Sequence, residues 1–177
     1  MSKVLHELPR FVSTHTPPPR KYHVRAHVNF FQRLIELESW ATYHSSHWDP
    51  KGLHLHLDPA ASDIELGEAA WAVLRAARFV PPDHPDWSMF DRSWTPEEDR
   101  AYHAGLMARA GVKSRKALYA GAVSVSMERE DGVITLSTSV AHGNNGFRGV
   151  GLADVVLPDT VGPEALAQAL RAAVARV

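Results

Sequence analysis

An alternating stretch in the last third of the chain sets the strongest constraint on the fold. Apolar and polar residues alternate through Val123–Glu128 (VSVSME), which is the two-residue period of a strand with one buried face. Glu130-Asp131-Gly132 follows as a turn, because Gly132 can adopt a positive φ without steric cost. Val133–Leu136 then supplies residues that favour β structure and returns the chain. The sequence therefore predicts a β-hairpin over residues 122–137, with no obvious nucleophile or metal ligand in it.

Helix signals flank this hairpin on both sides. Capping residues, N-terminal prolines and apolar spacing predict three helices: Ile64 to just before Pro81, Pro96–Ala110, and Pro163 to the C-terminus. Helical spacing predicts that the first and last of these bury the following residues: Leu66, Ala70, Leu74, Ala77, Leu166, Ala169, Leu170, Ala173, Val174 and Val177. Strands are predicted at Leu53–Leu57 and Asp154–Leu157, whereas His27–Glu38 fits either a strand or a short helix.

Together these elements predict an α+β or mixed α/β fold with one central sheet. The sheet should have about five to six strands, include the 122–137 hairpin, and be packed by about three helices. A length of 177 residues suits a single domain over 1–177. Residues 1–20 are expected to form a loosely attached N-terminal segment, because Thr14–Arg20 (THTPPPR) is rich in proline.

Composition excludes several classes of protein. No apolar run approaches the ~20 residues of a membrane span, and the N-terminus lacks the apolar core of a secretory signal. The absence of cysteine excludes disulfides, thiol catalysis and Cys-ligated zinc. We therefore expect a cytoplasmic protein that does not contact membranes.

Charge is unevenly distributed along the chain. The whole chain has a net charge of −1, but residues 58–99 contain ten acidic and three basic residues, a net charge of −7. Such a segment would repel nucleic acid phosphates, so direct nucleic acid binding is not expected. It could face a basic protein, where complementary charge speeds association. The alternative is that these carboxylates only solvate loops and helix ends.

The segment Asp83–Asp99 is the leading candidate for a protein-binding surface. It combines acidic side chains with two tryptophans in sequence typical of a loop, a composition found at interaction hot spots. The predicted binding residues are Asp83, Asp86, Trp87, Asp91, Trp94, Glu97 and Glu98. The two tryptophans could equally fold back and pack as a small satellite cluster.

A histidine pattern offers an enzymatic alternative. His54 and His56 lie at i and i+2 on a predicted strand, so both imidazoles could reach one metal ion, with Asp58 as a further ligand. The pattern partly resembles the H-x-H-x-D-H motif of metallo-β-lactamase-like hydrolases, but Pro59 stands where that family has its last histidine. We favour the interpretation that the two histidines occupy the polar face of an amphipathic strand. No metal site and no catalytic residue are predicted.

The glycine-rich stretch Ala141–Gly151 invites comparison with a phosphate-binding loop. It has neither a G-K-[ST] nor a G-x-G-x-x-G motif, and a strand rather than a helix is predicted after it. We therefore interpret it as a flexible connection.

Three groups of residues resemble a known family. The first is in and around the hairpin: Arg115–Tyr119, Val125–Arg129 and Asp131–Ser137. The second is Leu66–Ala69 with Leu74 and Ala77–Phe79, and the third is Pro163–Leu166 with Leu170. These resemble the immunity proteins of bacterial contact-dependent growth inhibition (CDI) systems, over roughly residues 66–177. The chain departs from the family at 141–151, where a charged segment with a tryptophan is expected.

The resemblance implies a protein that is not an enzyme and needs no cofactor. It implies binding, in a 1:1 complex, to the C-terminal toxin domain of a cognate CDI effector. Toxins of such systems are often nucleases, for example tRNases, and nuclease surfaces are basic. Asp83–Asp99 would then be the toxin-facing segment, and would block the active site or the path of the substrate.

Overall fold

The computed structural model describes residues 19–144 and 146–177, and predictions for residues 1–18 lie outside this part. One curled, mostly antiparallel sheet runs through the molecule in the order β3-β2-β1-β6-β7-β8, with β4 and β5 also paired to β2 and β9 to β7. The strands are β1 His23–Phe31, β2 Leu34–Thr42, β3 Ser46–Trp48, β4 His54–Leu57, β5 Arg78–Phe79, β6 Val123–Glu130, β7 Val133–Ala141, β8 Phe147–Gly149 and β9 Val155–Pro158. The helices are α1 Asp63–Ala76, α2 Pro96–Ala110, α3 Arg115–Tyr119 and α4 Pro163–Val174, with a 3₁₀ helix at Trp87–Asp91.

The predicted hairpin is confirmed as the pair β6 and β7. Glu130 pairs with Val133, so Asp131 and Gly132 form a two-residue turn. Both turn residues have a positive φ, 48° and 80° respectively, which matches the right-handed twist of the flanking strands. The register places Val125 and Met127 on one face of the sheet, where they are fully buried.

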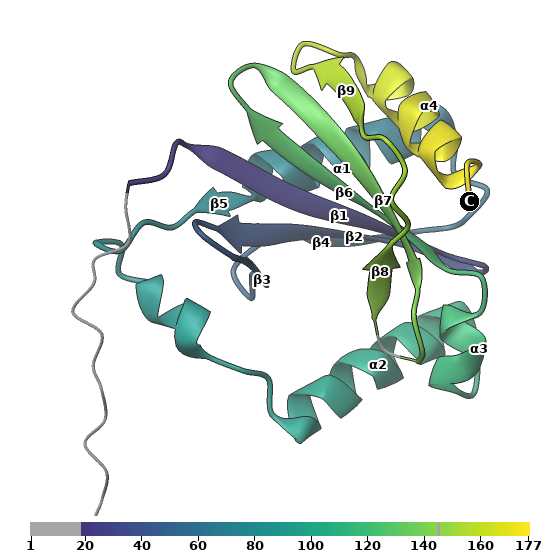
Figure 1. The fold of residues 1–177 in the computed structure, drawn as a ribbon. Coiled ribbons are helices and arrows are strands. Elements are labelled where there is room, and N and C mark those ends of the chain that lie inside the picture. Colours follow the sequence, from purple (N-terminus) through teal and green to yellow (C-terminus); the bar gives the residue numbers. More distant parts are fainter. Residues whose placement is uncertain (1–18, 145) are drawn as a thin grey trace, which may run out of the picture.

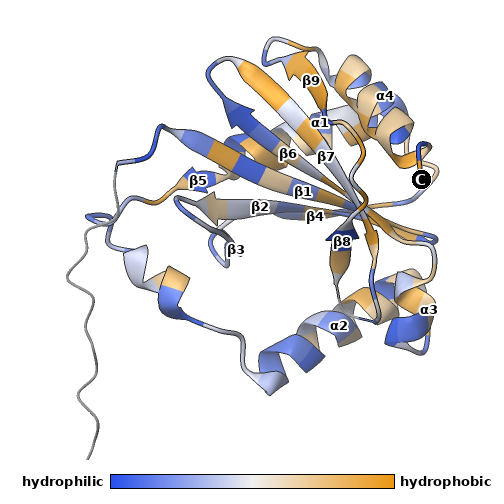
Figure 2. Ribbon diagram, viewed as in Figure 1, coloured by the Kyte–Doolittle hydropathy of each residue, from blue (hydrophilic) through white to orange (hydrophobic). Residues whose placement is uncertain are grey.

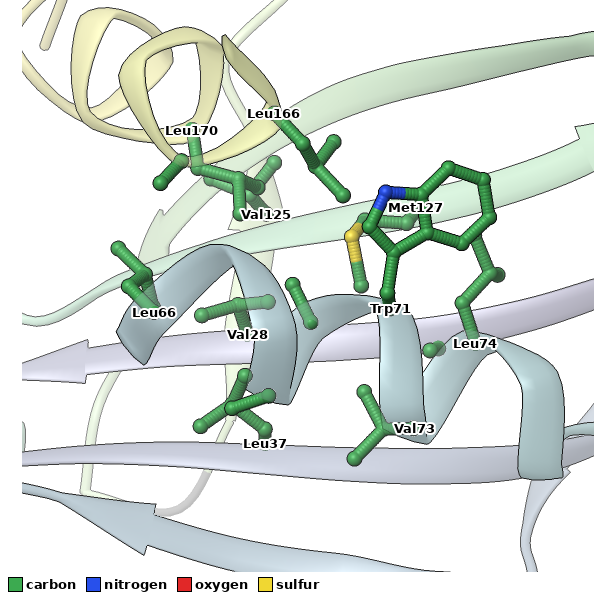
Figure 3. Packing of buried hydrophobic residues seen from close by; sticks show 14 of the residues in the cluster. Val28, Leu37, Leu66, Trp71, Val73, Leu74, Val125, Met127, Leu166 and Leu170 are labelled. Atoms are coloured by element: carbon green, nitrogen blue, oxygen red, sulfur yellow. The ribbon is translucent and has the colours of Figure 1, made fainter. Parts of the chain in front are cut away.

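The apolar face of the sheet packs against α1 and α4. Alternate residues of β1, β2, β6 and β7 meet the buried sides of these helices in one continuous core, part of which Figure 3 shows. The predicted helical stripe Leu66, Ala70, Leu74 and Ala77 is buried. In the last helix Leu166, Leu170 and Ala173 are buried as predicted.

Helix α1 and helix α4 approach each other closely at a glycine. A Cβ atom added at Gly67 would lie 1.9 Å from the carbonyl oxygen of Pro163, the first residue of α4. Nearby, the indole of Trp71 donates a hydrogen bond of 3.1 Å to the carbonyl oxygen of Val161. Arg171 Nε lies 2.8 Å from Asp63 Oδ1. These contacts fix α4 against α1, and Gly67 permits the approach because it has no side chain.

The opposite face of the sheet is polar and is covered unevenly. Its largest cover is α2, which is mostly hydrophilic (Figure 2) and lies with α3 on the other side of the molecule from α1 and α4 (Figure 1). The C-terminal half of α2 is held by a second apolar cluster, in which Leu106 and Ala110 join Phe31, Leu34 and Leu118. The N-terminal half of α2 contributes no buried apolar residue. The apolar contacts of α2 are therefore concentrated in its C-terminal half, and polar contacts such as Arg115 with Asp99 hold its N-terminal half.

Some sequence predictions need correction. The first helix ends at Ala76 and the chain then forms β5, because Arg78 and Phe79 pair with the edge of β2. Val177 is exposed, since α4 ends at Val174, before a further turn could bury it. Stretch 141–151 is not only a connection: Phe147–Gly149 forms β8, whose Phe147 contacts the second apolar cluster. Residues 27–38 form parts of two strands, β1 and β2, and no helix.

The glycine at the α1–α4 contact gives a matched pair of variants. We expect Gly67→Ala to lower the free energy of unfolding by about 1–3 kcal/mol or more, because backbone atoms of Pro163 must move to admit the methyl group. Gly105, in the interior of α2, has no atom within 4 Å of an added Cβ. Gly105→Ala should therefore raise stability by roughly 0.5–1 kcal/mol through helix propensity. Urea denaturation of both variants measures this, and equal effects would contradict the close approach.

Candidate functional site

A cleft of about 480 Å³ lies between the polar face of the sheet and the N-terminal half of α2. It exists because α2 is attached through Leu106 and Ala110 and leaves the sheet uncovered beyond them. Its walls come from β1, β2, β3, β6, β7, the 83–99 segment, α2 and the region of β8. The lining includes the following polar and aromatic residues: His27, Asn29, Glu38, Trp40, Trp48, Trp94 and Tyr102.

Two glutamates are buried side by side at the base of this region. Glu36 and Glu38 alternate with apolar residues on β2, and their side chains therefore project to the polar face. They are only 2% and 3% exposed. Tyr102 Oη lies 2.9 Å from Glu36 Oε2 and 3.1 Å from Glu38 Oε1, while Asn29 Nδ2 donates to Glu36 Oε2 at 3.0 Å and to Glu38 Oε2 at 3.4 Å. Tyr102 of α2 and Asn29 of β1 thus each contact both carboxyl groups.

Burial raises the pKa of both glutamates. For Glu36 the second cause is the charge of Glu38, and the raised pKa of Glu36 is about 8. For Glu38 the charge of His54 and the nearby Tyr102, Trp40 and Trp48 partly oppose the effect of burial on the pKa. Two carboxylates in contact at low dielectric cannot both ionise without a nearby cation, so the pair retains a proton near neutral pH. His56 Nε2 lies 3.9 Å from Glu36 Oε1, and no lysine or arginine forms an ion pair with either glutamate in the described ranges 19–144 and 146–177.

Several residues that line the cleft have buried polar atoms that lack hydrogen-bond partners. Five buried side-chain nitrogen or oxygen atoms in the described part of the chain have no hydrogen-bond partner. Four of them belong to residues that line this cleft: His27 Nε2, Asn29 Oδ1, Trp40 Nε1 and Trp48 Nε1. The two indole N–H groups lie near enough to Glu38 to lower its pKa, but not in hydrogen-bonding geometry. Buried polar groups are normally satisfied, so this concentration marks the cleft as a place where a ligand can supply partners.

Aromatic side chains from the 83–99 segment close one side of the cleft. The ring of Trp94 packs edge-on against Trp48, with centroids 5.2 Å apart, and against Tyr102 at 5.0 Å. Trp94 is still 36% exposed, so it forms part of the rim. The segment that carries it is attached to the sheet by a second contact, in which Asp86 accepts hydrogen bonds from Arg78 and Lys51, both at 2.6 Å.

Comparisons with known proteins connect this architecture to a family. The sequence model of the family described as "CDI immunity protein" matches residues 24–177. This chain belongs to the CDI immunity protein family. The immunity protein CdiI-YPIII of Yersinia pseudotuberculosis serotype O:3 (strain YPIII) is 27% identical over 165 residues, which cover 85% of this chain and 93% of that protein.

Solved structures give the same result for the fold. A chain of the "CdiA-CT/CdiI toxin and immunity complex from Yersinia pseudotuberculosis" matches with a TM-score of 0.78 and 27% identity, over 88% of this chain and 97% of that one. A protein of unknown function from Neisseria meningitidis, NMB0488, matches with a TM-score of 0.76 and 21% identity, over 89% and 96% of the two chains. The recognition of the family from the hairpin and helix motifs is therefore confirmed.

The predicted binding residues of this immunity protein divide into two groups. Three of them have clear structural roles. Asp86 anchors the segment, and its pKa is lowered to about 2 by Lys51 and Arg78. Glu98 completes the capping box of α2 with Thr95. Trp87 is half-buried and packs edge-on against Tyr43, with centroids 5.4 Å apart, so it forms the satellite cluster that the sequence left as an alternative.

The other predicted residues remain available at the surface. Asp83 and Asp91 are exposed, and neither forms an ion pair with another described residue. Glu97 is exposed, and its ion pair among the described residues is with Arg100 on the same helix. Trp94 stands at the rim of the cleft. The structure thus brings one end of the predicted segment to the cleft and leaves Asp83 and Asp91 facing solvent.

The alternative metal site is not favoured by the geometry. His54 Nε2 lies 2.8 Å from the carbonyl oxygen of Asp49, and its ring stacks on Trp48 with centroids 4.6 Å apart. Asp58 accepts a hydrogen bond from the backbone N–H of Ala60 and so shapes the turn before α1. Over residues 19–144 and 146–177 no three His, Cys, Asp or Glu side chains are grouped as ligands for a metal ion. The predicted strand itself is confirmed, with Leu53, Leu55 and Leu57 packed against the core.

The carboxyl pair beside the cleft was not predicted from the sequence. Glu36 and Glu38 stand in the run LIELESW, where apolar neighbours at every second position indicate a buried strand. Two acidic residues with the same period inside such a strand indicate an acidic face that something must cover. Tyr102 covers this acidic face. Its contact with the glutamates could not be predicted, because Tyr102 is 64 residues from Glu38 in the sequence.

The carboxyl pair predicts an unusual dependence of stability on pH. Folding raises the pKa of Glu36 from 4.5 to about 8, so the folded state binds more protons than the unfolded state in this range. The pair's contribution to stability is therefore complete below about pH 4.5 and is lost as the pH rises through the raised pKa. Glu36→Gln, which stays neutral, should remove this loss. We compare the free energy of unfolding of the variant with that of the parent at each pH. The difference, variant minus parent, should increase by about 1–3 kcal/mol between about pH 5 and pH 9.

The measurement is urea denaturation of the parent and the variant at several pH values. Glu68→Gln is the matched control, because Glu68 is exposed on α1. The difference between this control and the parent should stay constant with pH. A difference for Glu36→Gln that is equally flat would contradict the retained proton.

Proposed function

We propose that this protein binds the C-terminal toxin domain of a cognate CDI effector in a 1:1 complex and neutralises it. The observation that carries the proposal is the likeness, over 88% of the chain, to a chain of a solved toxin and immunity complex. The match of the family model to residues 24–177 supports it. In this proposal the protein acts by binding alone, with no catalytic step and no cofactor.

We further propose that the toxin is a nuclease, such as a tRNase, and that the complex forms in the cytoplasm without contact between this protein and nucleic acid or membrane. The charge of −7 over residues 58–99 supports a basic partner. No helix in the described part of the chain is long and apolar enough to cross a membrane. Bound carboxylates would occupy the path that phosphates take to the nuclease active site.

The toxin-facing surface is proposed to be the 83–99 segment together with the cleft that it borders. Asp83, Asp91 and Glu97 offer exposed charge, and Trp94 offers a partly exposed ring at the rim. Asp86, Trp87 and Glu98 hold this surface in place through their contacts with the sheet and with α2. Loops that a rigid scaffold positions in this way commonly carry recognition.

Neutralisation is tested by titrating the purified toxin domain of the cognate CDI effector with the full-length protein. Cleavage of a tRNA mixture and of duplex DNA should fall linearly and reach zero at one equivalent. A toxin domain that binds but cleaves neither substrate would refute the nuclease assignment alone. A toxin domain that neither binds nor is inhibited would refute the proposed function for that pair.

Charge reversal tests the position of the surface. Asp83→Lys with Asp91→Lys should slow association with the toxin roughly tenfold or more at low salt, and the effect should shrink above about 0.1 M salt, where the Debye length is about 10 Å. Neither side chain forms an ion pair within the described residues, so the fold should be unaffected. Stopped-flow fluorescence measures the rates.

The matched control reverses two exposed carboxylates on the helices of the opposite face, Glu68→Lys with Glu164→Lys. It changes the net charge by the same amount. An equal loss of rate in this control would show that only net charge matters, and the 83–99 segment would then lose its special role.

A further inference from the structure

The cleft has the properties of a binding site for one kind of side chain. Among the described residues its lining contains the carboxyl groups of Glu38 and Asp99 and no lysine or arginine, and Asp99 is already paired with Arg115 at 2.6 Å. The lining histidine His27 is neutral, because burial, followed by the charge of Arg25, lowers its pKa to about 3. The other lining histidine, His103, is buried and engaged with the backbone of Asp99 and with Tyr119 Oη. Glu38 is therefore the lining carboxyl group that has no lysine or arginine partner among the described residues, and its charge favours a cation.

An unpartnered acceptor independently indicates a ligand that donates hydrogen bonds. Asn29 is 6% exposed, lines the cleft, and leaves its Oδ1 atom without a partner. Its Nδ2 atom is turned toward Glu36 and Glu38, so Oδ1 is directed away from the carboxyl pair. A buried acceptor left without a donor costs about 1–3 kcal/mol, so an entering N–H group would be stabilised here.

The walls of the cleft suit a flat cation. Trp40, Trp48, Trp94 and Tyr102 all line it. Trp48 and Trp94 meet edge-on, as do Trp94 and Tyr102, and Trp94 is 36% exposed at the rim. A guanidinium group stacks on aromatic faces and at the same time donates several hydrogen bonds in one plane, whereas an ammonium group is a strongly hydrated point charge.

We propose that the cleft receives an arginine side chain of the toxin, whose guanidinium group stacks on the tryptophans and donates to Glu38 and to Asn29 Oδ1. This inference rests on the proposed function, because it assigns the arginine to the toxin. The acid pair that is costly in the free protein then becomes the counter-charge of a buried cation.

The test uses the full-length protein and N-acetyl-L-arginine amide, which imitates one arginine residue. Tryptophan indole N–H signals in ¹H–¹⁵N spectra should shift saturably, with a dissociation constant on the order of 1 mM or weaker. The isosteric but neutral N-acetyl-L-citrulline amide should bind at least about tenfold more weakly. Equal binding of the citrulline compound would overturn the cation site, and equal binding of N-acetyl-L-lysine amide would overturn the assignment of a guanidinium group.

Variants locate the site. Glu38→Gln keeps the size of the side chain and should weaken arginine binding at least about tenfold, whereas the exposed control Glu68→Gln should bind as the parent does. Unchanged binding in Glu38→Gln would overturn the proposal. If that variant does not fold, Trp94→Ala at the rim replaces it, and should weaken binding several-fold.

Two further outcomes are distinguished in the same samples. Self-association in sedimentation that disappears in Glu38→Gln would assign the cleft to a second copy of this chain and overturn the proposal. A protein that neutralises the toxin but does not bind the arginine probe would refute this inference and leave the proposed function standing.

Discussion

The opposite polarity of the two faces of the sheet determines the rest of the architecture. Alternate residues of β1, β2, β6 and β7 are apolar on one face, which is sealed by α1 and α4 around Leu66, Trp71 and Leu170. The other face carries Asn29, Glu36 and Glu38, and it offers apolar contact to a helix near Phe31 and Leu34. Helix α2 attaches through Leu106 and Ala110 at one end. The cleft, its aromatic rim and its acidic base all follow from this arrangement.

A binding role explains why the chain tolerates a buried acid pair. Two glutamates that are almost fully buried oppose folding when they ionise, and an apolar pair in the same positions would avoid this cost. Tyr102 and Asn29 supply only part of the hydrogen bonding that two carboxylates can accept. A partner that brings a cation would complete it. In this account the free protein holds a site that is incomplete without its toxin, and the acidic 83–99 segment guides the toxin to it.

The sequence predicted the parts of the fold that depend on local patterns. The hairpin, the helix over Pro96–Ala110 and the helix that begins at Pro163 were all identified correctly. The predictions failed where a distant contact decides the outcome. Pairing with β2 turns residues 78–79 into a strand, and pairing with β7 creates β8 inside a glycine-rich stretch. The binding residues were predicted from charge, which could not reveal that Asp86 would be neutralised by Arg78, or that Tyr102 would cover Glu36.

Hydrogen–deuterium exchange of the free and toxin-bound protein tests the proposed position of the partner. Toxin binding should slow exchange in residues 83–99 and in the N-terminal half of α2, which form one side of the cleft. Exchange in α1 and α4, which lie on the opposite face of the sheet, should change little. Slower exchange confined to α1 and α4, with residues 83–99 unaffected, would contradict the proposed surface.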